Sequence, residues 1–203
     1  MPTVTDIKKQ KRSETRYSIY LDGKYVLSLS DLDLSNSGLR VGHEVSEERV
    51  QELQSQSQGS KAYAQALRYI GIRPRSEREV RDYLVRKETA PADADTAVER
   101  LRGLALIDDL EFAAAWIRHR QSVNPRSRRR LEQELMQKGV ERGTIEEALR
   151  ELDGDTELDT LVALIERKQR LPQYSEREKL MAYFARQGYG YDVIKRALER
   201  VQK

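Results

Sequence analysis

The chain has 203 residues, of which 35% are charged and only 6% are aromatic, so several thin hydrophobic cores are expected rather than one thick core. It has no cysteine, which excludes a disulfide framework and a thiolate metal site and agrees with a reducing compartment. The formal net charge of +3 is weak evidence for a nucleic-acid partner.

The sequence carries no signal for export or for a membrane. Its first residues, MPTVTDIKKQKR, are basic but are not followed by the apolar run of a secretory signal. No stretch approaches the roughly twenty apolar residues that a membrane span needs. We therefore expect a soluble, cytoplasmic protein.

Residues 1–59 are predicted to form an N-terminal extension. Residues 1–14 are polar and basic, and we expect them to be frayed. In residues 16–29, two runs rich in Tyr, Ile, Val and Leu flank Asp22-Gly23, the strongest short-range signal for a two-residue β-hairpin turn. Because a lone hairpin is marginal in water, we expect it to pack on residues 32–53.

The tyrosines of the predicted hairpin leave two roles open. Strand aromatics stack on bases in some single-strand nucleic-acid binders, but more often they make the packed face of a sheet. These residues are Tyr17, Tyr20 and Tyr25.

The end of the extension is predicted to be a helix followed by a hinge. Ser46 can cap a helix that runs to about Ser55. Residues 54–60, QSQSQGS, are polar and of low complexity, which predicts a flexible hinge. A separate helix is then expected over residues 61–70.

An internal repeat organises the rest of the chain. Residues 74–78 and 125–129 both read Pro-Arg-Ser-x-Arg, and a pair of apolar residues one helical turn apart follows each of them and recurs at Leu180 and Phe184. Three copies with a period near fifty residues predict tandem three-helix repeats, which resemble helix-turn-helix units in outline. We assign them to residues 60–107, 108–153 and 154–203, so the fold is predicted to be mostly α.

The central helix of the second repeat has clear start and stop signals. Ser127 is a good N-cap, and Gly139 can end the helix in the left-handed conformation. Capping boxes are predicted for three other helices, and Asp108 or Asp109 can cap the helix that carries Trp116, whose expected role is core packing. The predicted boxes are Ser76 with Glu79, Thr144 with Glu147, and Ser175 with Glu178.

Basic residues gather around the central helix. Arginines crowd its first turn, where the helix dipole disfavours cations, so a partner anion or solvent must offset the cost. Between residues 118 and 142, eight basic residues stand against three acidic ones, a local charge of +5 that suits phosphate or an acidic protein surface. The alternative is a solvated helical face without a partner.

Nothing in the sequence indicates an active site. It has no phosphate-binding loop and no dinucleotide fingerprint, and its two histidines, His43 and His119, lie far apart in sequence. Helix capping explains the Asp108-Asp109 pair. We therefore predict a protein that is not an enzyme and that uses no cofactor and no metal.

The motif set of the repeats resembles the RecX family, the bacterial regulators of the RecA recombinase. The resemblance covers about residues 60–200, and the hairpin resembles an extension found in some members. The blocks that carry it are Ser76-x-x-Glu79-Val80-x-x-Tyr83-Leu84, Leu106-Ile107-Asp108-Asp109-x-x-Phe112-Ala113-x-x-Trp116-Ile117-x-x-Arg120, and Leu131-x-x-Glu134-Leu135-x-x-Lys138-Gly139-Val140.

The resemblance implies a shape, a partner and a function. The repeats would form an elongated, curved solenoid that lies along the groove of the RecA–DNA filament as a monomer. The protein would typically inhibit RecA, restraining its ATPase, strand-exchange and co-protease activities. The basic residues are then the expected contacts with acidic protein or phosphate, with possible direct contact to single- or double-stranded DNA; these residues are Arg126, Arg128, Arg129, Arg130, Lys138, Arg75 and Arg78.

A second function remains open at this stage. A helical nucleic-acid-binding module that acts independently of RecA would use the same basic helix start on a phosphate backbone. Such a module should show a steep salt dependence on free DNA, whereas a filament ligand should bind free DNA weakly.

Overall fold

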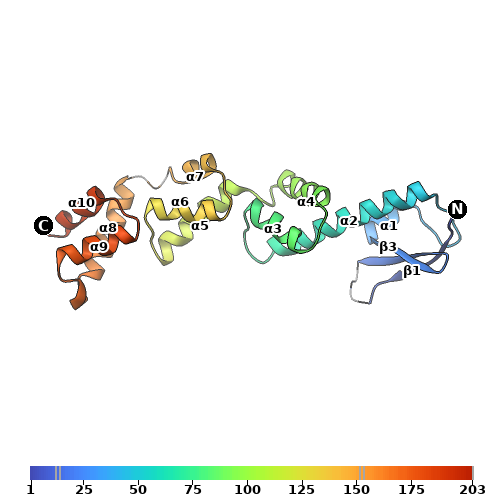
Figure 1. Cartoon of the computed structure of the whole chain (residues 1–203), viewed down its shortest axis with the longest axis horizontal. Coiled ribbons are helices and arrows are strands. Elements are labelled where there is room, and N and C mark those ends of the chain that lie inside the picture. The colour runs from blue at the N-terminus through green and yellow to red at the C-terminus, as the bar shows by residue number, and fades with distance from the viewer. Residues whose placement is uncertain (12, 14, 151, 153, 203) are drawn as a thin grey trace. The chain divides into compact units, whose positions relative to one another are not determined.

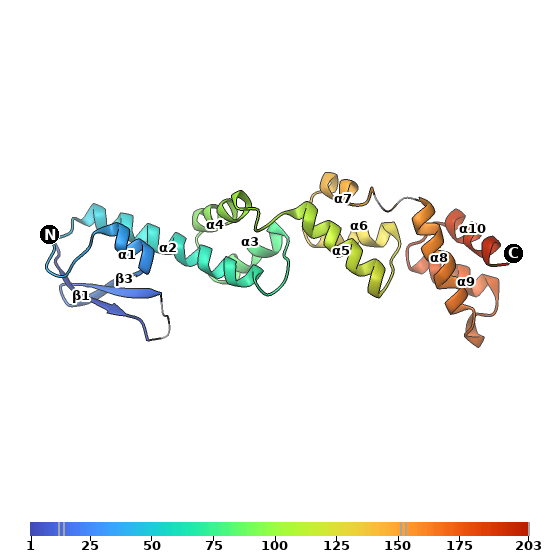
Figure 2. The ribbon, with the colours of Figure 1, turned by 180° about the vertical axis from the view of Figure 1, so that it is seen from behind.

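The computed structural model describes residues 1–11, 13, 15–150, 152 and 154–202. Its contacts divide the chain into two units. The first unit comprises Met1–Pro74 and Val80–Leu106, and the second comprises Arg75–Glu79 and the chain from Ile107 onward. The ribbon is mostly helical, with a small sheet at the N-terminal end (Figure 1, Figure 2).

The sheet of the first unit confirms the hairpin and adds a third strand. Strands β1 (Val4–Lys9), β2 (Arg16–Leu21) and β3 (Lys24–Ser30) are antiparallel in the order β1-β2-β3. The turn between β2 and β3 uses Asp22 at φ 46° and Gly23 at φ 76°, which are the positive angles of a type I′ turn.

The expectation that residues 1–14 are frayed is wrong for the part that forms β1. Its backbone pairs with β2, and Val4 is fully buried. Strand pairing and burial supply a stabilisation that the polar composition does not reveal. Positions 12 and 14 of this stretch lie outside the described residues.

The predicted hinge is also wrong, because residues 54–60 lie inside helix α2 (Glu47–Ile70). Ser46 caps this helix as predicted, accepting from the backbone N–H of Arg49 at 3.2 Å. Ser57 is buried and donates to the carbonyl of Ser28 in β3. The polar run is helical because one of its faces packs on the sheet, and this tertiary contact overrides the local preference.

The rest of the first unit contains α1 (Asp31–Ser37), most of α3 (Glu77–Arg86), and α4 (Pro91–Gly103). Helix α2 packs against both β3 and α4. It therefore contributes to the core under the sheet and to the core of the first three-helix repeat. Val80, Leu84 and Leu101 are fully buried in that repeat.

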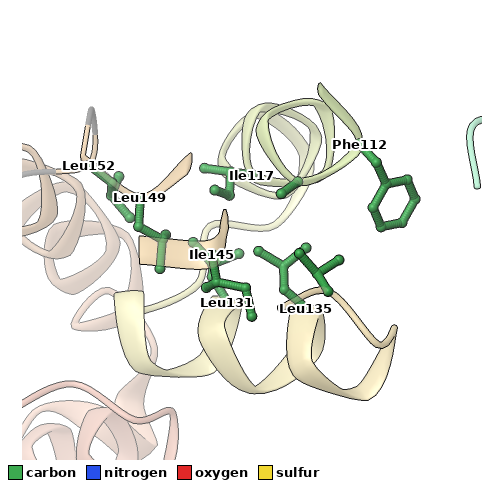
Figure 3. Packing of buried hydrophobic residues seen from close by; sticks show 9 residues of the cluster. Phe112, Ile117, Leu131, Leu135, Ile145, Leu149 and Leu152 are labelled. Carbon is green, nitrogen blue, oxygen red and sulfur yellow. The ribbon is translucent and has the colours of Figure 1, made fainter. Parts of the chain in front are cut away.

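Besides Arg75–Glu79, the second unit contains the repeat formed by α5 (Asp109–Val123), α6 (Arg128–Gln137) and α7 (Arg142–Ala148). Its buried side chains converge from all three helices (Figure 3). Trp116 packs against this cluster, as predicted. The buried residues are Phe112, Ala113, Ile117, Leu131, Leu135, Val140, Ile145, Leu149 and Leu152.

The last repeat consists of α8 (Gly154–Lys168), the 3-10 turn η1 (Pro172–Tyr174), α9 (Arg177–Arg186) and α10 (Tyr191–Val201). Leu180 and Phe184, the apolar pair expected from the repeat, are buried in its core. Three tandem three-helix repeats are thereby confirmed. The domain limits 1–59, 60–107, 108–153 and 154–203 stay predictions, and residues 153 and 203 lie outside the described residues.

Two of the three predicted capping boxes are wrong. Helix α7 has its N-cap at Glu141, three residues before the expected cap at Thr144, because the earlier start lets Ile145 pack in the same buried cluster as Val140. Helix α9 begins after Glu176. Ser175 donates instead to the carbonyl of Pro172 at 3.0 Å, a local bond that competes with capping.

No helix in the described part of the chain is long and apolar enough to cross a membrane.

Candidate functional site

The Pro-Arg-Ser segment of the first repeat lies in a junction with the second repeat. Ser76 is fully buried, and its hydroxyl donates to the carbonyl of Lys138 at 2.6 Å. The same hydroxyl accepts from the N–H of Glu79 at 3.2 Å, while the Glu79 carboxylate accepts from the N–H of Ser76 at 3.4 Å. The predicted capping box is therefore present, and its serine also satisfies an orphan carbonyl at the end of α6.

Two charged contacts reinforce this first junction. The N–H of Glu77, at the start of α3, donates to the Asp109 carboxylate at 2.8 Å. The Lys138 ammonium lies 2.9 Å from the Glu79 carboxylate, and both side chains are largely buried. Burial raises the pKa of Asp109, and the bond from Glu77 opposes the rise.

The second junction repeats the arrangement fifty residues later. Ser127 is fully buried and donates to the carbonyl of Gln187, at the end of α9, at 2.9 Å. The N–H of Arg128 donates to the Glu157 carboxylate of α8 at 2.8 Å. In both junctions, the second helix of one repeat is bonded at its start to two helices of the following repeat. Its serine hydroxyl donates to a carbonyl at the end of that repeat's second helix, and a backbone N–H donates to a carboxylate on that repeat's first helix.

A glycine makes each junction possible. Gly139 has φ +79° and Gly188 has φ +90°, a region that other residues rarely adopt. A Cβ on Gly139 would come within 2.5 Å of the Arg78 Cβ, and a Cβ on Gly188 would come within 2.8 Å of the Ser127 hydroxyl. The glycine therefore ends the helix, as predicted for Gly139, and also leaves room for the start of α3 at Gly139 and for the start of α6 at Gly188.

Several predicted contact residues have partners within the chain. Arg128 donates to two carbonyls that follow α7, those of Leu149 at 2.6 Å and Leu152 at 2.8 Å. A guanidinium at a helix C-terminus is favourable, so Arg128 stabilises the second repeat. Arg126 donates to the side chain of Gln187 at 3.1 Å, which places it in the second junction.

Other predicted contact residues face solvent. Arg129 and Arg130 are exposed; Arg130 donates weakly to Gln133 at 3.4 Å. Arg78 is exposed and lies against Gly139, whereas Arg75 is half-buried. The seven predicted contact residues therefore do not form a single exposed basic surface, because some of them are bonded within the chain and others are exposed.

A side-chain cluster that the sequence interpretation missed surrounds Trp116. Its indole N–H donates to Glu134 at 2.9 Å, and Arg120 donates to the same carboxylate oxygen at 2.8 Å. The Arg120 guanidinium and the Lys138 ammonium lie 4.7 and 4.8 Å from the centre of the indole ring. These cation–π contacts and hydrogen bonds connect α5 to α6 and to the first junction.

The repeat period was the signal that could have revealed this cluster. Arg120 and Glu134 each stand 51 residues after Tyr69 and Tyr83 of the first repeat, and Lys168 and Tyr183 of the third repeat follow them by 48 and 49 residues. The two tyrosines of the first repeat stack with ring centres 4.1 Å apart, and Lys168 lies 4.2 Å from the Tyr183 ring. The contact between these two positions, one on the first helix and one on the second helix of a repeat, is thus a ring stack in the first repeat, an ion pair in the second and a cation–π contact in the third.

No group of three or more His, Asp or Glu side chains suited to hold a metal occurs among the described residues.

Family models match the N-terminal part of the chain and each of its three repeats. Family models match as "Regulatory protein RecX N-terminal domain" over residues 2–46 and as the first, second and third three-helix domains of RecX over residues 62–101, 108–149 and 155–198. "Regulatory protein RecX" of Bacillus subtilis (strain 168) is 30% identical over 206 residues, covering 100% of this chain and 78% of the relative. The chain belongs to the RecX family.

Further RecX proteins agree with the assignment. "Regulatory protein RecX" of Bacillus pumilus (strain SAFR-032) is 32% identical over 204 residues, covering 98% of this chain and 77% of the relative. A crystal structure of regulatory protein RecX superposes with a TM-score of 0.77 at 26% identity, covering 98% of this chain and 100% of the other. RecX from Lactobacillus salivarius, at 22% identity and a TM-score of 0.65 over 71% of this chain and 97% of the other, shares the fold.

Proposed function

We propose that this chain regulates RecA by binding along the groove of the RecA–DNA filament, and that it does so as a monomer without catalytic activity of its own. Membership of the RecX family over all four domains carries this proposal. The names of the relatives describe regulatory proteins. Binding would lower the ATPase, strand-exchange and co-protease activities of RecA.

The contact with the filament is assigned to the basic side chains that face solvent. Arg129 and Arg130 are exposed at the start of α6, and Arg78 is exposed on α3. These guanidinium groups can form bidentate hydrogen bonds with carboxylates or phosphates of the filament. Arg126, Arg128 and Lys138 support the contact indirectly, because their bonds hold the junction and the second repeat together.

The test is the steady-state ATPase rate of RecA on single-stranded DNA, titrated with this protein, beside its binding to the same DNA alone. We expect inhibition at concentrations well below those that coat free DNA. The double variant Arg129→Ala/Arg130→Ala should shift the inhibition curve to higher concentration by at least tenfold, since two charge-assisted contacts are worth about 1.5–3 kcal/mol each and a tenfold change in affinity is about 1.4 kcal/mol.

A control variant removes the same charge elsewhere in the second repeat. Arg142 and Arg150 are both exposed, and Arg142 pairs only with Glu146 of its own helix at 2.9 Å among the contacts described. Arg142→Ala/Arg150→Ala should inhibit like the wild type. An equal loss in both double variants would mean that net charge, not the start of α6, governs binding.

The same experiment distinguishes the alternative, a nucleic-acid-binding module independent of RecA. No effect on RecA combined with tight binding to free DNA would favour that alternative. Its affinity should then fall with salt at a slope of roughly 0.9 per neutralised phosphate on duplex.

A further inference from the structure

The N-terminal sheet has an open face that carries an aromatic pair. Ile19 and Leu21 of β2 are buried with Val45 and Leu53 under α2. Since successive side chains of a strand point to opposite faces, Tyr20 points away from this core. Both views show α1 and α2 on one side of the sheet (Figure 1, Figure 2).

The tyrosines of the hairpin are divided between the two faces. Tyr17 pairs with the buried Leu29 and therefore lies on the core side. Tyr20 pairs with Tyr25 across the hairpin, where a bulge shifts the register. Their ring centres are 6.0 Å apart at an interplanar angle of 74°, and Tyr25 is 56% exposed. This edge-to-face geometry fixes the rings and leaves a ring surface open to solvent.

A cation lies beside the pair. The Lys8 ammonium lies 5.4 Å from the centre of the Tyr20 ring and contacts the Asp6 carboxylate. On β2, Arg16 is half-buried, and one of its terminal nitrogens donates to the carbonyl of Ser28 at 2.7 Å and to the hydroxyl of the buried Ser57 of α2 at 3.2 Å. Lys8 therefore lies beside the ring pair, whereas Arg16 is engaged with α2.

The first thirty residues carry an excess of basic side chains. Residues 1–30 contain six Lys or Arg (8, 9, 11, 12, 16 and 24) and three Asp or Glu (6, 14 and 22), a difference of +3 that equals the formal net charge of all 203 residues. The remainder of the chain, with 31 basic and 31 acidic residues, is neutral in sum. This excess can attract a polyanion to the sheet, as can the local charge of +5 between residues 118 and 142.

We propose that the open face of this sheet, centred on Tyr20 and Tyr25, binds single-stranded nucleic acid. A base stacks on the exposed Tyr25 ring, and Lys8 meets a flanking phosphate. Exposed aromatic rings with interspersed cations suit unpaired bases, because each base offers a π-face and each linkage a negative charge. A duplex does not fit, since its bases are already stacked on one another.

The test uses the full chain without RecA and measures fluorescence anisotropy of a labelled oligo-dT, an oligo-U, a duplex, and an abasic strand of the same length and charge. The wild type should bind oligo-dT at least fivefold more tightly than the abasic strand, which corresponds to about 1 kcal/mol for one stacked base. Oligo-U reports whether the site also accepts RNA.

Variants separate stacking from charge. Tyr25→Leu should abolish the preference for bases over abasic linkages, whereas Tyr25→Phe should retain it. Tyr191→Leu is the matched control, since Tyr191 is 66% exposed but lies in α10. Asp6→Asn should tighten binding of every strand by about twofold or more, because it removes the charge that competes for Lys8.

Each contrary result overturns the proposal. Equal affinity for oligo-dT and the abasic strand would mean that only charge is recognised. A duplex bound as tightly as the single strand, or a Tyr25→Leu variant that keeps the base preference, would exclude stacking on this ring. Because RecA is absent from the assay, its outcome is independent of the ATPase test.

Discussion

Replacing Gly139 by alanine tests whether a glycine is needed where the start of α3 contacts the end of α6. Gly139 has φ +79°, a conformation that costs an alanine roughly 1–2 kcal/mol. The new Cβ would also meet Arg78, whose Cβ, Cγ and Cδ would lie 2.5, 2.8 and 2.0 Å away. Relief of such overpacking costs typically about 1–3 kcal/mol, so Gly139→Ala should destabilise the chain by about 2–5 kcal/mol.

A matched control lies four residues further along the chain. Gly143 lies in α7, and a Cβ there would meet no atom within 4 Å outside its own helix. Because alanine is the better helix former, Gly143→Ala should stabilise the repeat by up to about 1 kcal/mol. The same Gly-to-Ala change is therefore expected to act in opposite directions at the two positions.

Urea unfolding followed by tryptophan fluorescence measures both variants. Trp116 is the chain's only tryptophan, and the Lys138 ammonium next to Gly139 lies 4.8 Å from the centre of its ring. The signal therefore reports on the repeat that contains both glycines. A Gly139→Ala variant whose free energy of unfolding lies within about 0.5 kcal/mol of the wild type would refute the reasoning, since that is the range of neutral surface changes.

Two further predictions concern charged groups near the junctions. Arg128→Met should lower the free energy of unfolding by about 2–4 kcal/mol, because the carbonyls of Leu149 and Leu152 lose their charged donor; a urea midpoint equal to the wild type would contradict this role. Burial raises the folded-state pKa of Asp109 above its ordinary value of 3.8, so its favourable contribution is complete below pH 3.8 and is lost as the pH rises through the raised value. Asp109→Asn keeps an acceptor for the N–H of Glu77 and removes the charge, so its stability should fall less over this pH range; parallel pH profiles of the urea midpoint would show that the prediction is wrong.

The sequence by itself determined the repeats and their helix signals. The Ser127 cap and the Gly139 stop are local patterns, which hydrogen bonds and backbone preferences satisfy within a few residues, and the fifty-residue period is the recurrence of such patterns along the chain. The Asp22-Gly23 turn belongs to the same class, because the turn type restricts its own two residues. These features could be predicted since their causes lie within a few neighbouring positions of the chain.

Only the tertiary structure decided what the polar segments do. Residues 54–60 are helical because Ser57 and its neighbours pack on β3, and that strand lies about thirty residues away in sequence. The arginines of the central helix differ in role for a similar reason: Arg128 reaches the carbonyls that follow α7, whereas Arg129, the next residue, faces solvent. A basic or polar residue takes its role from the acceptors that the fold places beside it, and no local pattern records those acceptors.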